Sequence, residues 1–203
     1  FWKFRLDPKN VGLSEAWHSH TRILETGSID INVPSCWEEL EQDYEGVAWY
    51  STQVEIDADK AGQICRIVFQ ASNYRTEIWI NGKAAGSHDG GYTPFDFEIQ
   101  DFLYYGASNQ ITVRIVSPII TKDIRVDDLG PNDMPHWRGG LTAGIWQSAT
   151  LEFNQSAWIK HTFYKPKIKD STFGLDLELR CNEATSQAAI LKIDVCDNKG
   201  ESV

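Results

Sequence analysis

Residues 79–99, WINGKAAGSHDGGYTPFDFEI, constrain the fold of this chain more than any other stretch. Apolar and polar residues alternate at both ends of it, as they do in half-buried strands. Between these ends, Asn81-Gly82 can take the positive φ angles of a tight hairpin turn. Residues 89–94 then make a glycine-rich connection with one carboxylate, Asp89. Because a loop held between two strands presents its polar groups in a fixed place, Asp89 is a candidate binding residue. A hairpin connection without a ligand is the alternative.

The rest of the chain consists of short strand patterns separated by turns, without a strong helical period. We expect one short helical turn at residues 101–105 with Asp101 as its cap, an acidic surface segment at residues 38–46, and a long loop at residues 118–137. Many short strands at regular spacing indicate an all-β sandwich or barrel. The expected strands are residues 1–6, 28–33, 49–56, 64–69, 76–80, 83–88, 95–99, 110–116 and 149–153.

A change of domain is predicted near residues 154–157. Three further strand patterns follow, at residues 158–164, 173–181 and 189–196, and three strands cannot complete a seven-stranded immunoglobulin-type sandwich. A chain of 203 residues is long enough for one packed domain and part of a second. Its first residues, FWKFRLDP, predict a strand and not a signal peptide. We therefore expect a piece of a longer protein without its native targeting signal. The compartment of the parent stays open, with the periplasm or secretion as the alternative considered.

Composition disfavours several classes of partner. The formal net charge is −10 and no basic run occurs, which argues against nucleic acid and anionic membrane surfaces. No apolar run approaches the roughly 20 residues of a membrane helix. Eight Trp suit a β-rich fold with indole rings that pack on sugar C–H faces, and a large aromatic core is the alternative explanation.

The cysteines and histidines indicate no metal site. The four cysteines contain no C-x-x-C pair, so we expect free thiols, with Cys65 and Cys181 buried on the apolar faces of strands. His18 and His20 have no cluster of further ligands near them in the sequence. We interpret them as solvated histidines and predict neither a metal nor a cofactor.

Five segments carry a resemblance to one protein family. They are WKFRLDP near the start, NVPS followed by Trp37, YEGVAWY at residues 44–50, IWINGK with GGYTPF across residues 78–95, and AGIW at residues 143–146. In this order they resemble the amino-terminal part of glycoside hydrolase family 2, which includes β-galactosidases, β-glucuronidases and β-mannosidases. The resemblance implies a jelly-roll, galactose-binding-domain-like β-sandwich over residues 1–154, then the truncated start of an immunoglobulin-like sandwich over residues 155–203.

The same resemblance guides the choice of site residues. The family is a retaining one, and its acid/base residue stands in an Asn-Glu pair on a barrel of roughly 250 residues. The one such pair here includes Glu183 after a strand of the second sandwich, so we interpret Glu183 as an exposed turn residue and assign no catalytic residue. Asp89 aligns with a loop aspartate that contacts the sugar in some family β-galactosidases. The alternative is that Asp89 stabilises its own turn.

Three residues of the long loop complete the candidate substrate-binding set. His136, Trp137 and Arg138 could line the sugar pocket, Trp137 by stacking and Arg138 by bonding hydroxyls or a carboxylate. A loop packed at the domain junction is the alternative. Two departures from the family leave the sugar open: Thr52 stands where such β-galactosidases often have Asn, and Arg138 lies near the place of an acidic residue in β-glucuronidases.

These observations lead to two hypotheses of function. The first is the non-catalytic amino-terminal part of a family 2 retaining exo-β-glycosidase of β-galactosidase type, which shapes the pocket for a β-glycoside substrate. Its partner is then the catalytic barrel of the same protein, and the isolated chain is predicted to be inactive. The second hypothesis is a free-standing carbohydrate-binding or adhesion module without a barrel. The length of the parent reading frame distinguishes the two.

Overall fold

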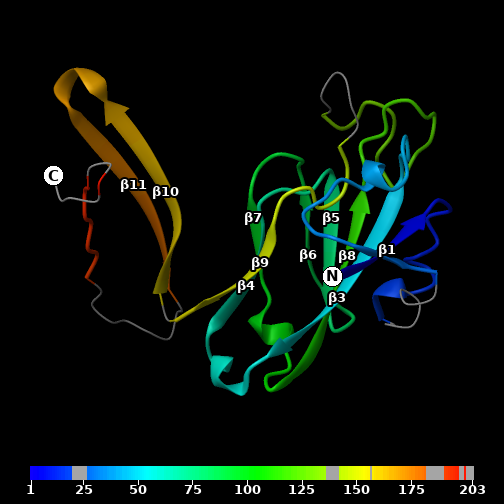
Figure 1. Cartoon of the computed structure of the whole chain (residues 1–203), viewed down its shortest axis with the longest axis horizontal. Coiled ribbons are helices and arrows are strands. Elements are labelled where there is room, and N and C mark those ends of the chain that lie inside the picture. The colour runs from blue at the N-terminus through cyan, green and yellow to red at the C-terminus, as the bar shows by residue number, and fades with distance from the viewer. Residues whose placement is uncertain (20–26, 136–141, 156, 182–189, 197–198, 200–203) are drawn as a thin grey trace. The chain divides into compact units, whose positions relative to one another are not determined.

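The structure is a computed structural model that describes residues 1–19, 27–135, 142–155, 157–181, 190–196 and 199. The chain divides into two compact units, Phe1–Gln155 and Ser156–Val203, and each is described by itself (Figure 1). Among the described residues, helices are limited to five turns of 3₁₀ type: Trp17–Ser19, Trp37–Glu39, Ala58–Lys60, Gln100–Phe102 and Ile168–Asp170. The same residues contain no helix long and apolar enough to cross a membrane.

The first unit consists of two antiparallel sheets. The larger sheet has six strands in the order β2-β1-β3-β8-β5-β6, and the smaller has three in the order β7-β4-β9 (Figure 1). The strands of the larger sheet are β1 (Trp2–Asp7), β2 (Ile29–Ile31), β3 (Val47–Ile56), β5 (Arg75–Ile80), β6 (Lys83–Asp89) and β8 (Ala107–Val116). Those of the smaller sheet are β4 (Ile64–Phe69), β7 (Phe95–Glu98) and β9 (Ala149–Asn154).

The inner faces of the two sheets enclose the main core. Because side chains alternate along a strand, Tyr50 of β3 and Ile78 of β5 point to the same side of the large sheet, where they join Phe69 of β4 in one cluster. Leu151 and Phe153 of β9 pack against this cluster from the small sheet. The expected all-β fold with a sandwich is therefore confirmed.

The outer face of the large sheet is covered as well. Trp49 and Trp79 stack there with ring centroids 5.3 Å apart, and Trp17 lies over Trp49. The loop after β8 contributes its own apolar residues to this second cluster, among them Ile119 and Met134. The central strands are consequently buried on both faces, which explains why Trp79 occupies the face that carries the polar residues of its strand.

Two local predictions in the first unit were wrong. The 3₁₀ turn Gln100–Phe102 has Ile99 at its N-cap position with no side-chain cap, because the N–H of Phe102 bonds the carbonyl of Ile99 and places Asp101 inside the turn. The acidic segment at residues 38–46 is not wholly at the surface. Its end is buried at Tyr44 and Glu45, because Glu45 binds the backbone of a distant loop.

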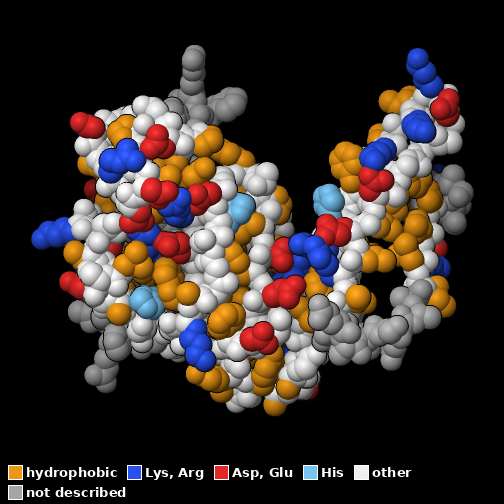
Figure 2. All heavy atoms as spheres, turned by 180° about the vertical axis from the view of Figure 1, so that it is seen from behind, with side chains coloured by type: hydrophobic (Ala, Val, Ile, Leu, Met, Phe, Trp, Pro, Cys, Tyr) orange, Lys and Arg blue, Asp and Glu red, His pale blue; other side chains and the backbone are white. Residues whose placement is uncertain are grey.

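The second unit is a two-stranded hairpin of β10 (Ala157–Lys167) and β11 (Thr172–Cys181). Hydrophobic side chains are visible across its surface in Figure 2. The predicted strand at residues 189–196 is not formed over residues 190–195. Cys181 is exposed, contrary to expectation, since the described residues of its own unit form a two-stranded hairpin without a second layer. All four cysteines are free, as predicted. The immunoglobulin-like assignment stays a prediction.

Candidate functional site

Asp89 is the last residue of β6 and stands opposite Arg75 of β5. The Arg75 guanidinium holds both carboxylate oxygens, with Nε donating to Oδ1 at 2.8 Å and Nη2 to Oδ2 at 2.7 Å. This is the bidentate geometry that makes arginine–carboxylate pairs specific. The Asp89 side chain remains 43% exposed, so its outer lone pairs face solvent. In the described part of the chain its partner is thus Arg75 and not the backbone of its own turn.

Arg75 also binds Asp128, which lies in the long loop after β8. The hydrogen bonds that Arg75 donates to Asp89, and then those to Asp128, raise the pKa of Arg75. In return, the bond from Arg75 lowers the pKa of the Asp128 carboxyl. Two carboxylates therefore share one cation, and the cluster of Arg75, Asp89 and Asp128 carries one net negative charge.

The glycine-rich loop after Asp89 is fixed by its surroundings. The N–H of Gly90 donates to the carbonyl of Tyr74 at 3.3 Å, and the indole N–H of Trp146 donates to the carbonyl of Gly91 at 2.8 Å. Neither glycine has room for a side chain: an added Cβ at Gly90 would meet the His88 ring, and one at Gly91 would meet the side-chain oxygen of Asn73. The loop is therefore rigid because of packing, and not merely short.

The His88 ring packs against this loop at Gly90. The imidazole stacks on Phe95 with the ring centroids 3.9 Å apart and an interplanar angle of 13°. Burial lowers the pKa of His88, and the negative charge of Asp89 counters only part of that effect. The imidazole is therefore neutral at pH 7 and acts as a packing element under Gly90.

Charged anchors hold the long loop of residues 118–135 against the sheet. Arg114 of β8 is completely buried and donates to Glu77, to Asp127 at 2.9 Å and to Asn10 at 2.9 Å. Glu45 binds the start of the same loop. With Arg75, these residues attach the loop at three places.

Three of the four predicted substrate-binding residues follow the long loop in sequence. The long loop leads to His136, Trp137 and Arg138, and these three lie outside the described residues, as do His20 and Glu183. His18 is described, and it stacks on Trp79 at 5.1 Å. The part of the chain that the structure describes contains no group of three His, Cys, Asp or Glu suited to a metal ion.

Sequence reasoning missed Arg75, Arg114 and Glu45. The available signal was a charged residue within or beside an apolar strand: Arg114 stands between Val113 and Ile115, and Glu45 stands two positions before the buried start of β3. Such residues need a partner when both faces of the sheet are covered. Their partners are 13 to 104 positions away in sequence, so the pattern alone could not identify them.

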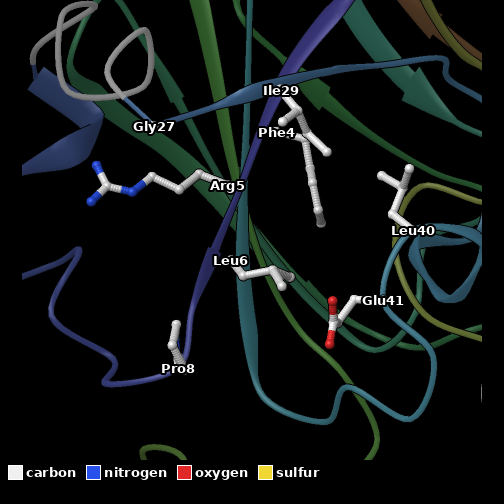
Figure 3. A pocket seen from close by; sticks show the side chains of 8 residues that line it. All are labelled: Phe4, Arg5, Leu6, Pro8, Gly27, Ile29, Leu40 and Glu41. Atoms are coloured by element: carbon white, nitrogen blue, oxygen red, sulfur yellow. The ribbon is translucent and has the colours of Figure 1, made fainter.

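A depression of about 370 Å³ lies elsewhere, beside β1 (Figure 3). Figure 3 shows Phe4 and Leu6 pointing to the side of Leu40 and Glu41, while Arg5 points to the other face of the strand. In the large sheet β1 and β6 are four strand positions apart, a separation of roughly 19 Å across the sheet. The depression is therefore separate from the cluster around Arg75.

Comparison with known proteins identifies the family. The sequence model of the sugar binding domain of glycosyl hydrolases family 2 matches residues 40–152. The chain is 28% identical over 119 residues to a β-glucuronidase of Paenibacillus borealis. This alignment covers 56% of this chain and 20% of that protein. It is 29% identical over 132 residues to a β-galactosidase of Thermoanaerobacter pseudethanolicus, and this alignment covers 64% of this chain and 17% of that protein.

A solved structure shows the same fold. The β-glucuronidase of Lactobacillus rhamnosus superimposes with a TM-score of 0.73 at 21% identity, over 100% of this chain and 35% of that one. The chain spans about a fifth of the length of the two curated relatives. Because the family model covers more than half of the sequence, the chain belongs to glycoside hydrolase family 2 and contains its sugar-binding domain.

Proposed function

We propose that this chain is the non-catalytic amino-terminal part of a retaining exo-β-glycosidase and that Asp89 forms part of its sugar subsite. One observation carries the proposal: Arg75 fixes a partly exposed carboxylate and, through Asp128, joins it to the loop that leads to His136, Trp137 and Arg138. A fixed carboxylate suits a sugar, since it accepts hydroxyl hydrogens with charge assistance. The three loop residues are proposed to line the same pocket.

The chemistry of the parent requires residues beyond the described ones. Retaining glycosidases use two carboxyl groups about 5 Å apart, one as nucleophile and one as acid and then base. The acidic residues of the Arg75 cluster are both paired with the same cation, which does not suit a general acid that must be protonated at neutral pH. We therefore propose that a barrel in the parent protein supplies both catalytic groups and that the isolated chain does not hydrolyse glycosides. This agrees with the greater length of the relatives.

The charge of the cluster favours a neutral sugar. Arg75 is already shared by two carboxylates, so a uronate placed beside Asp89 would meet a net negative charge. We therefore propose a terminal β-galactoside as the substrate. A β-glucuronide is the second candidate, because relatives of both names match the chain.

The test is release of nitrophenol from p-nitrophenyl β-D-galactopyranoside and β-D-glucuronide by the chain and by its parent protein. We expect no turnover by the chain. In the parent, Asp89→Ala should lower kcat/KM for the galactoside about tenfold to hundredfold, equivalent to about 1.5–3 kcal/mol. Asp123→Ala is the matched control, because Asp123 is an exposed acid of the long loop.

Three outcomes would contradict the proposal. Turnover by the chain that Glu183→Gln abolishes would make this part catalytic. An Asp89→Ala variant that melts earlier but keeps its rate would reduce Asp89 to a structural residue. A parent reading frame that ends near Val203 would support the free-standing carbohydrate-binding module.

A further inference from the structure

The loop next to Asp89 presents an aromatic ring that the proposed sugar subsite does not use. Tyr92 is 52% exposed, although Gly91 beside it is buried. Its ring meets the Trp146 ring edge-on, with centroids 5.9 Å apart and an interplanar angle of 64°. Two aromatic rings at this angle form a corner in which the edge of one ring faces the other, with Tyr92 exposed and Trp146 partly buried.

The corner is held in place before any ligand arrives. Trp146 donates its indole N–H to the carbonyl of Gly91, the residue before Tyr92. Gly91 itself packs against Asn73 so closely that no side chain would fit. The backbone directly before Tyr92 is therefore held both by a hydrogen bond and by packing. A rigid aromatic side chain loses little conformational entropy on binding, which makes it an effective contact residue.

The polar groups of the corner define the class of ligand. Among the described residues the Tyr92 hydroxyl has no hydrogen-bond partner, while Asp89 lies three positions earlier with its outer lone pairs in solvent. The face of an aromatic ring is electron-rich and attracts polarised C–H groups. A ligand with one C–H face and hydroxyls around its rim fits these features. The family model of the sugar binding domain covers both Tyr92 and Trp146.

We propose that the Tyr92 ring, braced edge-on by Trp146, is an aromatic platform on which a pyranose ring of the glycan stacks with its C–H face. The proposal deepens the proposed function and rests on it, since Asp89 would bond hydroxyls of the same glycan. A β-galactoside suits the platform, because its axial 4-hydroxyl leaves a continuous C–H face on the opposite side of the ring.

The chain contains its own reporter and its own control. The Trp146 indole N–H gives one nitrogen–proton NMR signal, which a Trp146→Phe variant assigns among the eight Trp. Tyr104 is 55% exposed, so Tyr104→Ala removes an equally exposed tyrosine from another loop. Methyl β-D-galactopyranoside is the probe, added to the labelled chain up to about 0.2 M because weak exposed sites bind in the millimolar range.

We expect the Trp146 signal to shift with sugar concentration. Tyr92→Ala should weaken binding about tenfold, as the loss of an aromatic contact and its area implies. Tyr92→Phe should retain most of the affinity, and Tyr104→Ala should bind like the unchanged chain. The melting temperatures of the variants should agree, since both tyrosines are exposed.

Asp89→Asn separates this proposal from the proposed sugar subsite. Binding that Asp89→Asn abolishes and Tyr92→Ala leaves unchanged would overturn the platform and keep the subsite. Binding lost only in Tyr92→Ala would keep the platform and remove Asp89 from the site. A probe that shifts another indole but not Trp146 would overturn the platform, and no response at all would contradict both proposals.

Discussion

Replacing Glu45 with alanine tests whether the long loop depends on one buried carboxylate. Glu45 is 5% exposed, and its two oxygens accept the backbone N–H groups of Ile120, Thr121 and Lys122 at 2.9–3.1 Å. They also accept the Thr121 hydroxyl at 2.8 Å. The alanine variant leaves three neighbouring N–H groups without this acceptor.

The magnitude follows from these contacts. A hydrogen bond to a charged group contributes about 1.5–3 kcal/mol, but water can reach part of the loop when the carboxylate is removed. We therefore expect Glu45→Ala to lower the free energy of unfolding by about 2–4 kcal/mol. For a domain of this size that corresponds to a fall in Tm of about 5–15 °C. The stability of Glu45→Gln should lie between that of Glu45→Ala and that of the unchanged chain, because the amide keeps one acceptor oxygen.

The pH dependence gives a second readout. Burial alone would raise the pKa of Glu45, but the hydrogen bonds from Thr121, Lys122 and Ile120 together lower it below its ordinary value. A lowered pKa in the folded state contributes stability that is present above the unfolded pKa of about 4.3. That contribution is lost as the pH falls toward the folded pKa. The difference in the free energy of unfolding between Glu45→Ala and the unchanged chain should therefore be constant near neutral pH and shrink below about pH 4.

Tryptophan fluorescence during urea unfolding measures the effect. Seven of the eight Trp precede residue 156, so the signal reports the first unit. Glu55→Ala is the control, since Glu55 is an exposed acid of β3. A loss below about 0.5 kcal/mol for Glu45→Ala, or a difference that does not shrink in acid, would refute the reasoning.

Three further predictions concern the same unit. Arg114→Met should cost about 2–4 kcal/mol in urea unfolding because it leaves Glu77 and Asp127 without their buried cation, and a cost near zero would contradict the anchoring role. Residues 1–155 should fold alone and unfold in one cooperative step, whereas an insoluble or molten fragment would show that the second unit shares its core. Burial raises the pKa of Cys65 to about 12, so it should react with a thiol reagent only on unfolding while Cys181 reacts at once, and fewer than four thiols in denatured, unreduced protein would indicate a disulfide.

Local pattern explains the parts of the fold that were predicted correctly. Strand β4 falls on residues 64–69 as predicted, because an apolar run between turns can bury itself in a sheet. Asn81 and Gly82 take φ angles of 51° and 78°, as the hairpin requires. Each segment that resembles the family is likewise a run of a few neighbouring residues. Each of these features depends on residues within a few positions of one another, and such information is present in the chain itself.

Long-range partners explain the parts that were missed. The position of the Asp89 carboxylate depends on its hydrogen bonds with Arg75. Arg75 is 14 positions away in sequence and becomes adjacent only when β5 and β6 pair. Cys181 is exposed even though its strand alternates as a buried strand would, since alternation shows that a face is apolar but not that another element covers it.

The sequence by itself determined the all-β class, the hairpin at Asn81-Gly82 and the family, because these depend on the period of apolar residues and on short motifs. Only the tertiary structure decided that both faces of the large sheet are covered and that Arg75, Arg114 and Glu45 attach the long loop to it. The physical reason is that a buried charge must find a partner of opposite charge or a hydrogen-bond donor. Which partner it finds is set by how the sheet brings distant segments together.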